Sequence, residues 1–120
     1  DGMNLLPALI DNAPPVPRKL YWRYKANGQR AMRDGDMKIL KEMDNTFLFN
    51  VVEDQLERAN LKNLRRDVYD RMVADWNTWN SAMLPEIDEA RSSGIVGRNI
   101  AERVGAKPWP GKPDTSDWPK

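Results

Sequence analysis

Residues 26–40, ANGQRAMRDGDMKIL, place two turn signals around a short run that carries two arginines. Asn27-Gly28 and Asp34-Gly35 are pairs that readily take the positive φ angles of tight hairpin turns. The chain is therefore predicted to reverse its direction on both sides of one short strand.

Alternation of apolar and polar residues extends outward from this stretch, from about residue 19 to residue 52. A period of two is typical of β-strands, and turn signals divide the region into segments 19–24, 29–33, 37–41 and 46–52. Connections this short require that strands adjacent in sequence are adjacent in the sheet. We therefore predict a four-stranded antiparallel meander.

The apolar spacing lengthens to three or four residues after Glu53, which is typical of one face of a helix. The apolar stripe consists of Leu61, Leu64, Val68, Met72, Trp76, Trp79 and Met83. The opposite side carries Asp67, Asp70, Arg71 and Asp75. Asn63 offers an N-cap and Pro85 ends the pattern, so a helix is predicted over residues 64–83. We interpret its tryptophans and methionines as core residues packed on the sheet, not as a cofactor site.

Proline-rich segments flank this unit. Residues 1–18 contain four prolines and are predicted to form a linker. Residues 86–104 are expected to add one or two short helical pieces broken at Gly94 and Gly97, and residues 105–120 to form an extended tail. The predicted fold class is α+β: a four-stranded antiparallel sheet with one long C-terminal helix packed on one face, between irregular Pro-rich ends.

Composition limits what this chain does by itself. Its 120 residues, 40% of them hydrophobic, suffice for one small core. A net charge of +1 gives no electrostatic case for nucleic acid or an anionic membrane, and no apolar run approaches the ~20 residues that span a bilayer. The absence of cysteine and histidine removes thiol nucleophiles, the usual zinc sites and the commonest general base. Independent catalysis is therefore not expected.

Four blocks follow one another in the sequence: DGMNLLPAL, PRKLYWRY, QRAMRDGDMKIL and NTFLFNVVEDQLERANL. In this order and spacing they resemble the C-terminal subdomain of the formylglycine-dependent sulfatases, the arylsulfatase branch of the alkaline phosphatase superfamily. The residues that match the family's motifs are Asp1, Gly2, Leu5 and Pro7; Arg18, Leu20 and Trp22; Ala31, Arg33, Gly35 and Lys38; and Asp54, Glu57, Asn60 and Leu61. Gln55 replaces a usual proline of the family, and Met37 replaces a frequent tryptophan.

The resemblance implies a division of the chain and a missing partner. Residues 1–18 would be the end of a sulfatase catalytic domain, residues 19–84 the C-terminal subdomain, and residues 85–120 a tail of unassigned role. Sulfatase chemistry needs a C/S-x-P-x-R motif converted to formylglycine, together with calcium ligands, and no serine here begins that motif. Formylglycine, calcium and all catalytic residues are therefore assigned to an absent N-terminal domain, and this chain alone is predicted to be inactive. The parent's compartment stays open among periplasm, cell exterior and cytoplasm.

The charged residues of the opening hairpin have two interpretations. In the structural one, Arg33 and Lys38 face each other across the turn and pair with acidic neighbours, namely Asp34, Asp36 or Glu42. In the functional one, the resemblance places the first hairpin loop at the rim of the sulfate-ester pocket. The candidate rim residues are Tyr24, Lys25, Asn27 and Arg30, with Gln29 beside them. Lys25 and Arg30 would then bind a carboxylate or a second sulfate on a sugar.

A different class of function stands beside the sulfatase hypothesis. The chain would be a free-standing carbohydrate- or protein-binding module that uses Trp22, Trp109 and Trp118 as stacking surfaces. The exposure of these tryptophans separates the two hypotheses.

The segment NTFLFNVV, residues 45–52, is apolar on both sides. Phe47, Phe49 and Val51 are expected on one face and Leu48 and Val52 on the other. A strand that is apolar on both faces is usually covered on both, and one helix covers only one. We therefore expect an apolar patch, shared with Leu20 or Tyr21, that contacts the catalytic domain in the parent. In the isolated chain we expect its own Pro-rich segments, a second copy or a crystal neighbour to cover it.

Overall fold

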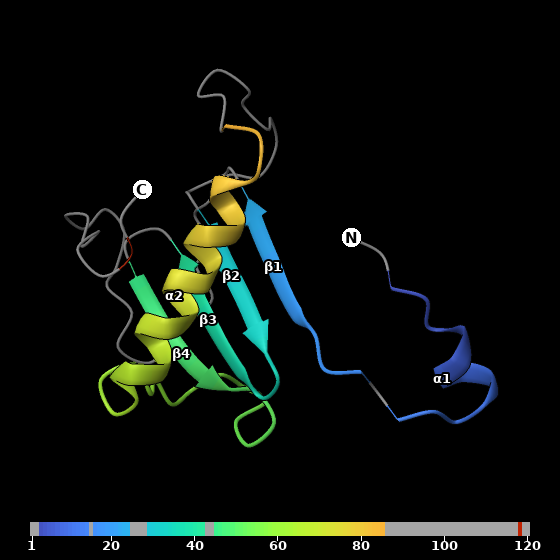
Figure 1. The fold of residues 1–120 in the computed structure, drawn as a ribbon. Coiled ribbons are helices and arrows are strands. Elements are labelled where there is room, and N and C mark those ends of the chain that lie inside the picture. The colour runs from blue at the N-terminus through green and yellow to red at the C-terminus, as the bar shows by residue number, and fades with distance from the viewer. Residues whose placement is uncertain (1–2, 15, 25–28, 43–44, 86–117, 119–120) are drawn as a thin grey trace, which may run out of the picture.

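The computed structural model describes residues 3–14, 16–24, 29–42, 45–85 and 118 (Figure 1). The elements in order are α1 (Leu6–Ile10), β1 (Lys19–Tyr24), β2 (Gln29–Asp34), β3 (Met37–Glu42), β4 (Asn45–Asn50) and α2 (Arg66–Ser81). The strands form one antiparallel sheet in the order β1-β2-β3-β4, and α2 lies across one face of it. The predicted α+β fold is thereby confirmed. The predicted turn at residues 26–28 and helical pieces at 86–104 lie outside the described residues.

The turn between β2 and β3 follows the sequence prediction. Gly35 has a φ of +59°, whereas Asp36 is not among the residues with positive φ. Glycine with positive φ at the first central position is the pattern of a type II′ turn, whose twist suits two adjacent strands. A side chain at Gly35 would meet nothing within 4 Å, so the backbone angle alone requires glycine there.

The strand register assigns each side chain to one face of the sheet. Tyr21, Met32, Ile39 and Leu48 form one row across the four strands. This row lies on the α2 side, where the last three of these side chains are buried in the core and Tyr21 packs against it. The neighbouring row, Trp22, Ala31, Leu40 and Phe47, must then project from the opposite face, because successive side chains alternate along a strand.

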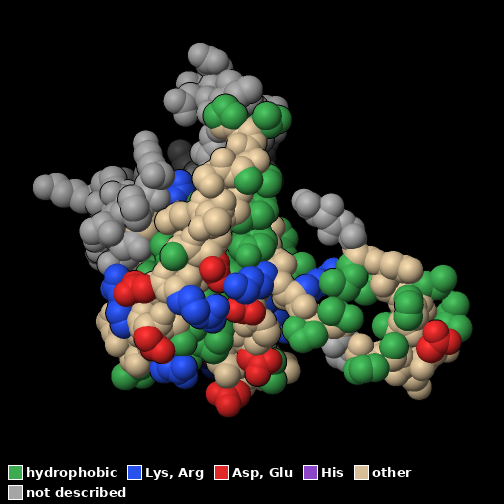
Figure 2. Space-filling view, in the orientation of Figure 1, with side chains coloured by type: hydrophobic (Ala, Val, Ile, Leu, Met, Phe, Trp, Pro, Cys, Tyr) green, Lys and Arg blue, Asp and Glu red, His purple; other side chains and the backbone are tan. Residues whose placement is uncertain are grey.

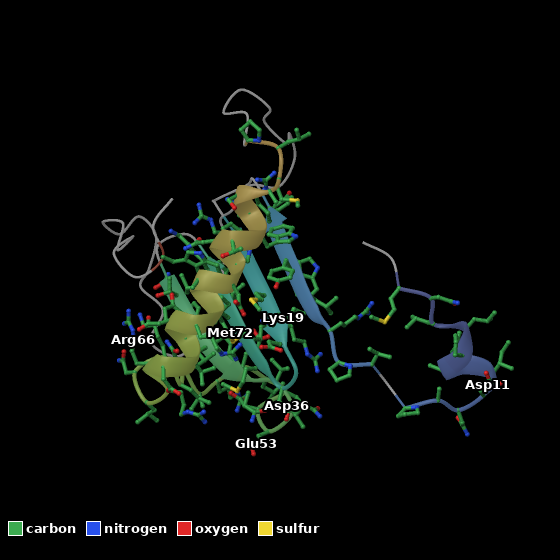
Figure 3. All side chains as sticks on the ribbon, viewed as in Figure 1. Asp11, Lys19, Asp36, Glu53, Arg66 and Met72 are labelled. Atoms are coloured by element: carbon green, nitrogen blue, oxygen red, sulfur yellow. The ribbon has the colours of Figure 1, made fainter. Side chains whose placement is uncertain are left out.

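Helix α2 buries Tyr69, Met72, Val73 and Trp76. Their spacing of three, one and three residues places all four on one stripe facing the sheet. Met72 points from α2 toward the strands (Figure 3). The interpretation of the tryptophan and methionine stripe as core is therefore confirmed for its central members.

Polar contacts join α2 to the strands beneath it. Lys19 of β1 pairs with Asp75 at 2.5 Å, and the hydrogen bond to that carboxylate raises the pKa of the lysine. Asp34 of β2 accepts from Arg71 at 2.8 Å, and Arg23 of β1 donates to Asn80 at 2.9 Å. Exposed pairs of this kind contribute about 0 to 1 kcal/mol each, so they orient the helix more than they stabilise it.

Helix α2 is shorter than predicted. It spans Arg66–Ser81, and residues 62–65 form turns instead of its first helical turn. The N-cap position is Arg65 and not Asn63, and no side chain caps it. Leu64, expected in the buried stripe, is 79% exposed because it precedes the helix.

Strand β4 also ends early, at Asn50 and not at Val52. The side-chain oxygen of Asn50 accepts from the backbone N–H groups of Val52 and Glu53, both at 3.1 Å. This Asx turn satisfies donors that would otherwise continue the sheet. Val52 is consequently exposed and does not extend the apolar face that Leu48 forms.

The N-terminal arm stands apart from the sheet and is joined to it through the segment before β1 (Figure 1). Helix α1 has a proline at its start and buries none of its residues. Its side chains and those beside it are largely apolar (Figure 2). Among its described residues, the predicted linker therefore holds one short helix, α1, and the large apolar side chains of that helix are exposed.

Gly35 provides a direct test of the β2–β3 turn. Gly35→Ala is expected to lower the free energy of unfolding by about 1 kcal/mol, because an L side chain disfavours the left-handed region. Gly35→Asn should lose less, because asparagine tolerates positive φ. Urea unfolding of both variants measures the difference, and an unchanged or more stable Ala variant would contradict the assigned backbone.

Candidate functional site

The candidate rim residues do not share one surface. Tyr24 ends β1 and is 37% exposed, whereas Arg30 of β2 is only 8% exposed. Register pairs Tyr24 with Gln29 and Arg23 with Arg30, so these two pairs project from opposite faces. The two arginines face α2, and Tyr24 and Gln29 face away from it.

Arg30 is placed against an aromatic ring of α2. Its guanidinium carbon lies 4.8 Å from the ring centroid of Trp76, which is a cation–π geometry. The other two candidate rim residues, Lys25 and Asn27, lie outside the described residues. Within the described part of the chain, Tyr24 and Gln29 are thus the members of the predicted rim that one face brings together.

The β2–β3 hairpin uses its charges in a way that the sequence only partly predicted. Arg33 and Lys38 are cross-strand neighbours, as expected. Their partners differ from the expected ones: Arg33 donates to the carbonyl of Gly35 at 2.9 Å, and Lys38 pairs with Glu57. Sequence reasoning considered only local acids, and Glu57 lies nineteen residues from Lys38.

Glu57 stands in a strained backbone position. Its φ is +54°, which a non-glycine residue rarely adopts. The ion pair with Lys38 fixes the side chain, and the Glu57 N–H donates to the Asp54 carbonyl at 3.1 Å. Two of the matched motif positions, one on β3 and one in the loop after β4, are therefore joined in a structural contact.

The block 54–61 closes the loop between β4 and α2. The Asp54 carboxylate accepts from the backbone N–H of Ala59 at 2.7 Å. The Asn60 side-chain oxygen accepts from the N–H of Leu48 at 3.1 Å, and its amide nitrogen donates to the carbonyl of Thr46 at 3.3 Å. The Asn60 side chain therefore makes hydrogen bonds at the outer edge of β4 that a neighbouring strand would otherwise make.

Leu61 completes this edge. Its N–H donates to the carbonyl of Leu48 at 2.8 Å, and its side chain packs against the core. Both backbone groups of Leu48 that face the edge are thereby satisfied, which a buried strand requires. Of the matched residues of this block, Asp54, Asn60 and Leu61 thus bond backbone groups, and Glu57 pairs with Lys38.

A second cluster lies on the helix face, where Trp118 returns from the C-terminal tail. Trp118 is fully buried, and its ring meets that of Trp76 edge-on, with centroids 5.3 Å apart and planes at 83°. Its carbonyl accepts from the Lys41 ammonium at 3.1 Å. Lys41 and Arg30 are direct cross-strand partners, so both cations border this aromatic pair.

The three tryptophans of the binding-module hypothesis have different environments. Trp22 is 48% exposed on the face that α2 leaves open, whereas Trp118 is buried. Trp109 lies outside the described residues. Of Trp22 and Trp118, only Trp22 has an exposed ring on which a ligand can stack.

The open face of the sheet carries the expected apolar residues unevenly. Phe47 and Phe49 stack on each other at 5.4 Å and are both buried. Leu20 is half-buried and Trp22 exposed. Among the described residues of this face, the exposed apolar surface therefore lies on β1, whereas the phenylalanines of β4 are buried.

The described residues contain neither a candidate metal-binding group nor a candidate membrane-spanning helix. No group of three or more acidic side chains there is placed to hold a metal ion. No helix in that part of the chain is both long and apolar enough to cross a bilayer. No protein-family model and no curated protein matches this sequence.

Asn60 is the sharpest test of the edge contact. Asn60→Ala is expected to lower the free energy of unfolding by about 2 kcal/mol, because the Leu48 N–H and the Thr46 carbonyl lose their partner. Asn60→Asp keeps the acceptor and should lose less. Chemical denaturation compares the two variants, and equal losses would show that the acceptor is not the stabilising atom.

Proposed function

We propose that this chain is the C-terminal subdomain of a sulfatase. A separate N-terminal domain would hydrolyse sulfate esters with formylglycine and calcium. This chain would give that domain structural support and, through the loop after Tyr24, part of the substrate-pocket rim. It contains neither the nucleophile nor the metal site of that chemistry.

The N-terminal arm is the observation on which this proposal depends most. Leu6, Leu9 and Ile10 of α1 are 56%, 78% and 70% exposed. An isolated helical turn is unstable in water, and apolar side chains gain roughly 1.5 to 3 kcal/mol each when they are buried. An arm of this composition gains most when it packs on another protein surface, which is the role that the family assigns to the end of its catalytic domain.

The open face of the sheet supports the same proposal. Trp22 and Leu20 lie on β1, an edge strand, on the side opposite α2. Edge strands with exposed large apolar side chains are favourable sites for contact with another protein. The arm and this face would provide two contact surfaces for the catalytic domain.

The motif residues add a third line of support. Lys38 and Glu57 belong to separate blocks of the resemblance, and they form an ion pair that joins β3 to the loop after β4. Residues that match a family by spacing and also cooperate in space are less readily explained by chance.

The reading frame upstream of Asp1 tests whether this chain belongs to a sulfatase. We expect a C/S-x-P-x-R motif within a few hundred residues before Asp1, followed by calcium ligands. Expression of that longer protein with a formylglycine-generating enzyme should give aryl sulfate hydrolysis. An upstream frame that lacks the motif would overturn the proposal.

The chain by itself is expected not to hydrolyse a chromogenic aryl sulfate above background, because sulfatase catalysis needs a nucleophile and a metal site that it lacks. The assay uses the purified chain with and without calcium. Turnover that survives repurification and disappears when one carboxylate of this chain is replaced would contradict this expectation.

A free-standing binding module is the second candidate, and the exposure of Trp22 favours it. Trp22 and Tyr24 are 48% and 37% exposed and project from the same face of β1. Aromatic rings in a row suit stacking on sugar rings or on a partner chain.

Titration with oligosaccharides distinguishes this candidate from the sulfatase proposal. A binding module should show saturable binding that Trp22→Ala abolishes. The control variant Val52→Ala, at another exposed apolar residue, should leave the binding intact. Binding that survives Trp22→Ala would show that the ligand does not stack on Trp22.

A further inference from the structure

Trp118 is the one described core residue that comes from outside the sheet and α2. The remaining members of the buried cluster all belong to β2, β3, β4 or α2. Trp118 reaches this cluster from far along the chain, since 77 residues separate it from Lys41, its hydrogen-bond donor. It therefore adds a residue from a distant part of the chain to a cluster that the sheet and α2 otherwise form.

We propose that the helix face carries a peptide-docking site, formed by Trp76, Arg30 and Lys41, that binds an acidic segment containing tryptophan. Its occupant in this chain is the segment around Trp118, which binds in cis. This inference is independent of the sulfatase proposal.

The site is held in place by contacts that do not involve the tail. The Trp76 indole N–H donates to the carbonyl of Trp22 at 3.1 Å. Trp79 lies against the same indole at 5.9 Å, and Arg30 lies over it at 4.8 Å. With β1, β2 and α2 fixing its ring, Trp76 presents a surface that is preorganised for a second aromatic group.

The contacts of Trp118 suit peptide recognition. An edge-on meeting of two indoles is a favoured aromatic geometry, worth about 0.5 to 1.5 kcal/mol beyond the buried area. The Lys41 ammonium at the Trp118 carbonyl adds a charge-assisted hydrogen bond to the backbone. The site thus binds one side chain and one main-chain carbonyl of the same residue.

Charge complementarity favours an acidic occupant. Arg23, Arg30 and Lys41 form a row across three neighbouring strands on this face. In the sequence, residues 114–120 carry Asp114 and Asp117 against Lys120, so their side chains have a net negative charge. By its charge and its tryptophan, such a segment suits a basic surface beside an aromatic ring.

The Trp118 segment belongs to the same chain as the site, so it can occupy the site most of the time and still exchange with a free peptide. A tethered segment experiences an effective concentration on the order of millimolar, so a weak contact suffices to keep it bound. A peptide with the same residues, added in excess, would compete for the site. The docking proposal thus differs from a fixed core residue in a measurable way.

The experiment uses the full chain with Trp118→Ala, and Trp22→Ala is the matched control because it removes a tryptophan from the opposite face. The probe is a synthetic peptide of residues 114–120, DTSDWPK, and its control is DTSDAPK. We expect Trp118→Ala to bind DTSDWPK saturably and to shift the indole N–H resonance of Trp76. DTSDAPK should not bind, and the Trp22→Ala chain, whose site is occupied, should bind DTSDWPK at least tenfold more weakly.

Two further measurements do not depend on whether Trp118→Ala folds. Excess DTSDWPK added to the unmodified chain should move the Trp118 indole resonance toward that of a solvent-exposed tryptophan. Lys41→Met in the full chain should raise the fraction of chains with a solvent-exposed Trp118 indole about tenfold without added peptide, because the hydrogen bond to the Trp118 carbonyl is lost.

Three results would overturn the proposal. The first is a folded Trp118→Ala chain that does not bind DTSDWPK, or binds it without a change at Trp76. The second is an unmodified chain whose Trp118 resonance stays fixed at every peptide concentration. The third is a concentration-dependent dimer that Trp118→Ala abolishes, which would place the segment in a second copy and not in cis.

Discussion

The fold depends on the placement of one indole, that of Trp76. Its N–H is bonded to β1 through the Trp22 carbonyl at 3.1 Å, and its ring lies against Arg30 of β2. Trp79 on the same helix and Trp118 from the tail contact it from other directions. Since it is fully buried, every element that approaches the helix face must fit around its shape.

The two edge strands of the sheet, β1 and β4, differ in how the rest of the chain covers them. On the β4 side, Asn60 and Leu61 satisfy the backbone groups of Leu48. On the β1 side, Trp22 is exposed on the open face. A small domain that stabilises one edge with its own residues and leaves apolar surface at the other is suited to contact a partner along that second side.

The sequence predicted the sheet almost completely, because a period of two and the Asp-Gly turn are local signals. It missed Tyr69 and Val73, since the predicted stripe was centred one residue away from the buried one. It also extended β4 to Val52, because the Asx turn of Asn50 depends on a side-chain contact that apolar periodicity does not encode. Long-range contacts such as Lys38–Glu57 and Lys41–Trp118 were out of reach for the same reason.

The matched residues of the loop before α2 and the exposed aromatic residues of β1 have different surroundings in this molecule. Asn60 bonds the backbone of β4, and Glu57 pairs with Lys38 of β3. Residues available for recognition, such as Trp22 and Tyr24, are instead found where the sheet remains open. Contacts that fix a scaffold are compatible with many functions, so activity must be sought on the surfaces that the scaffold leaves exposed.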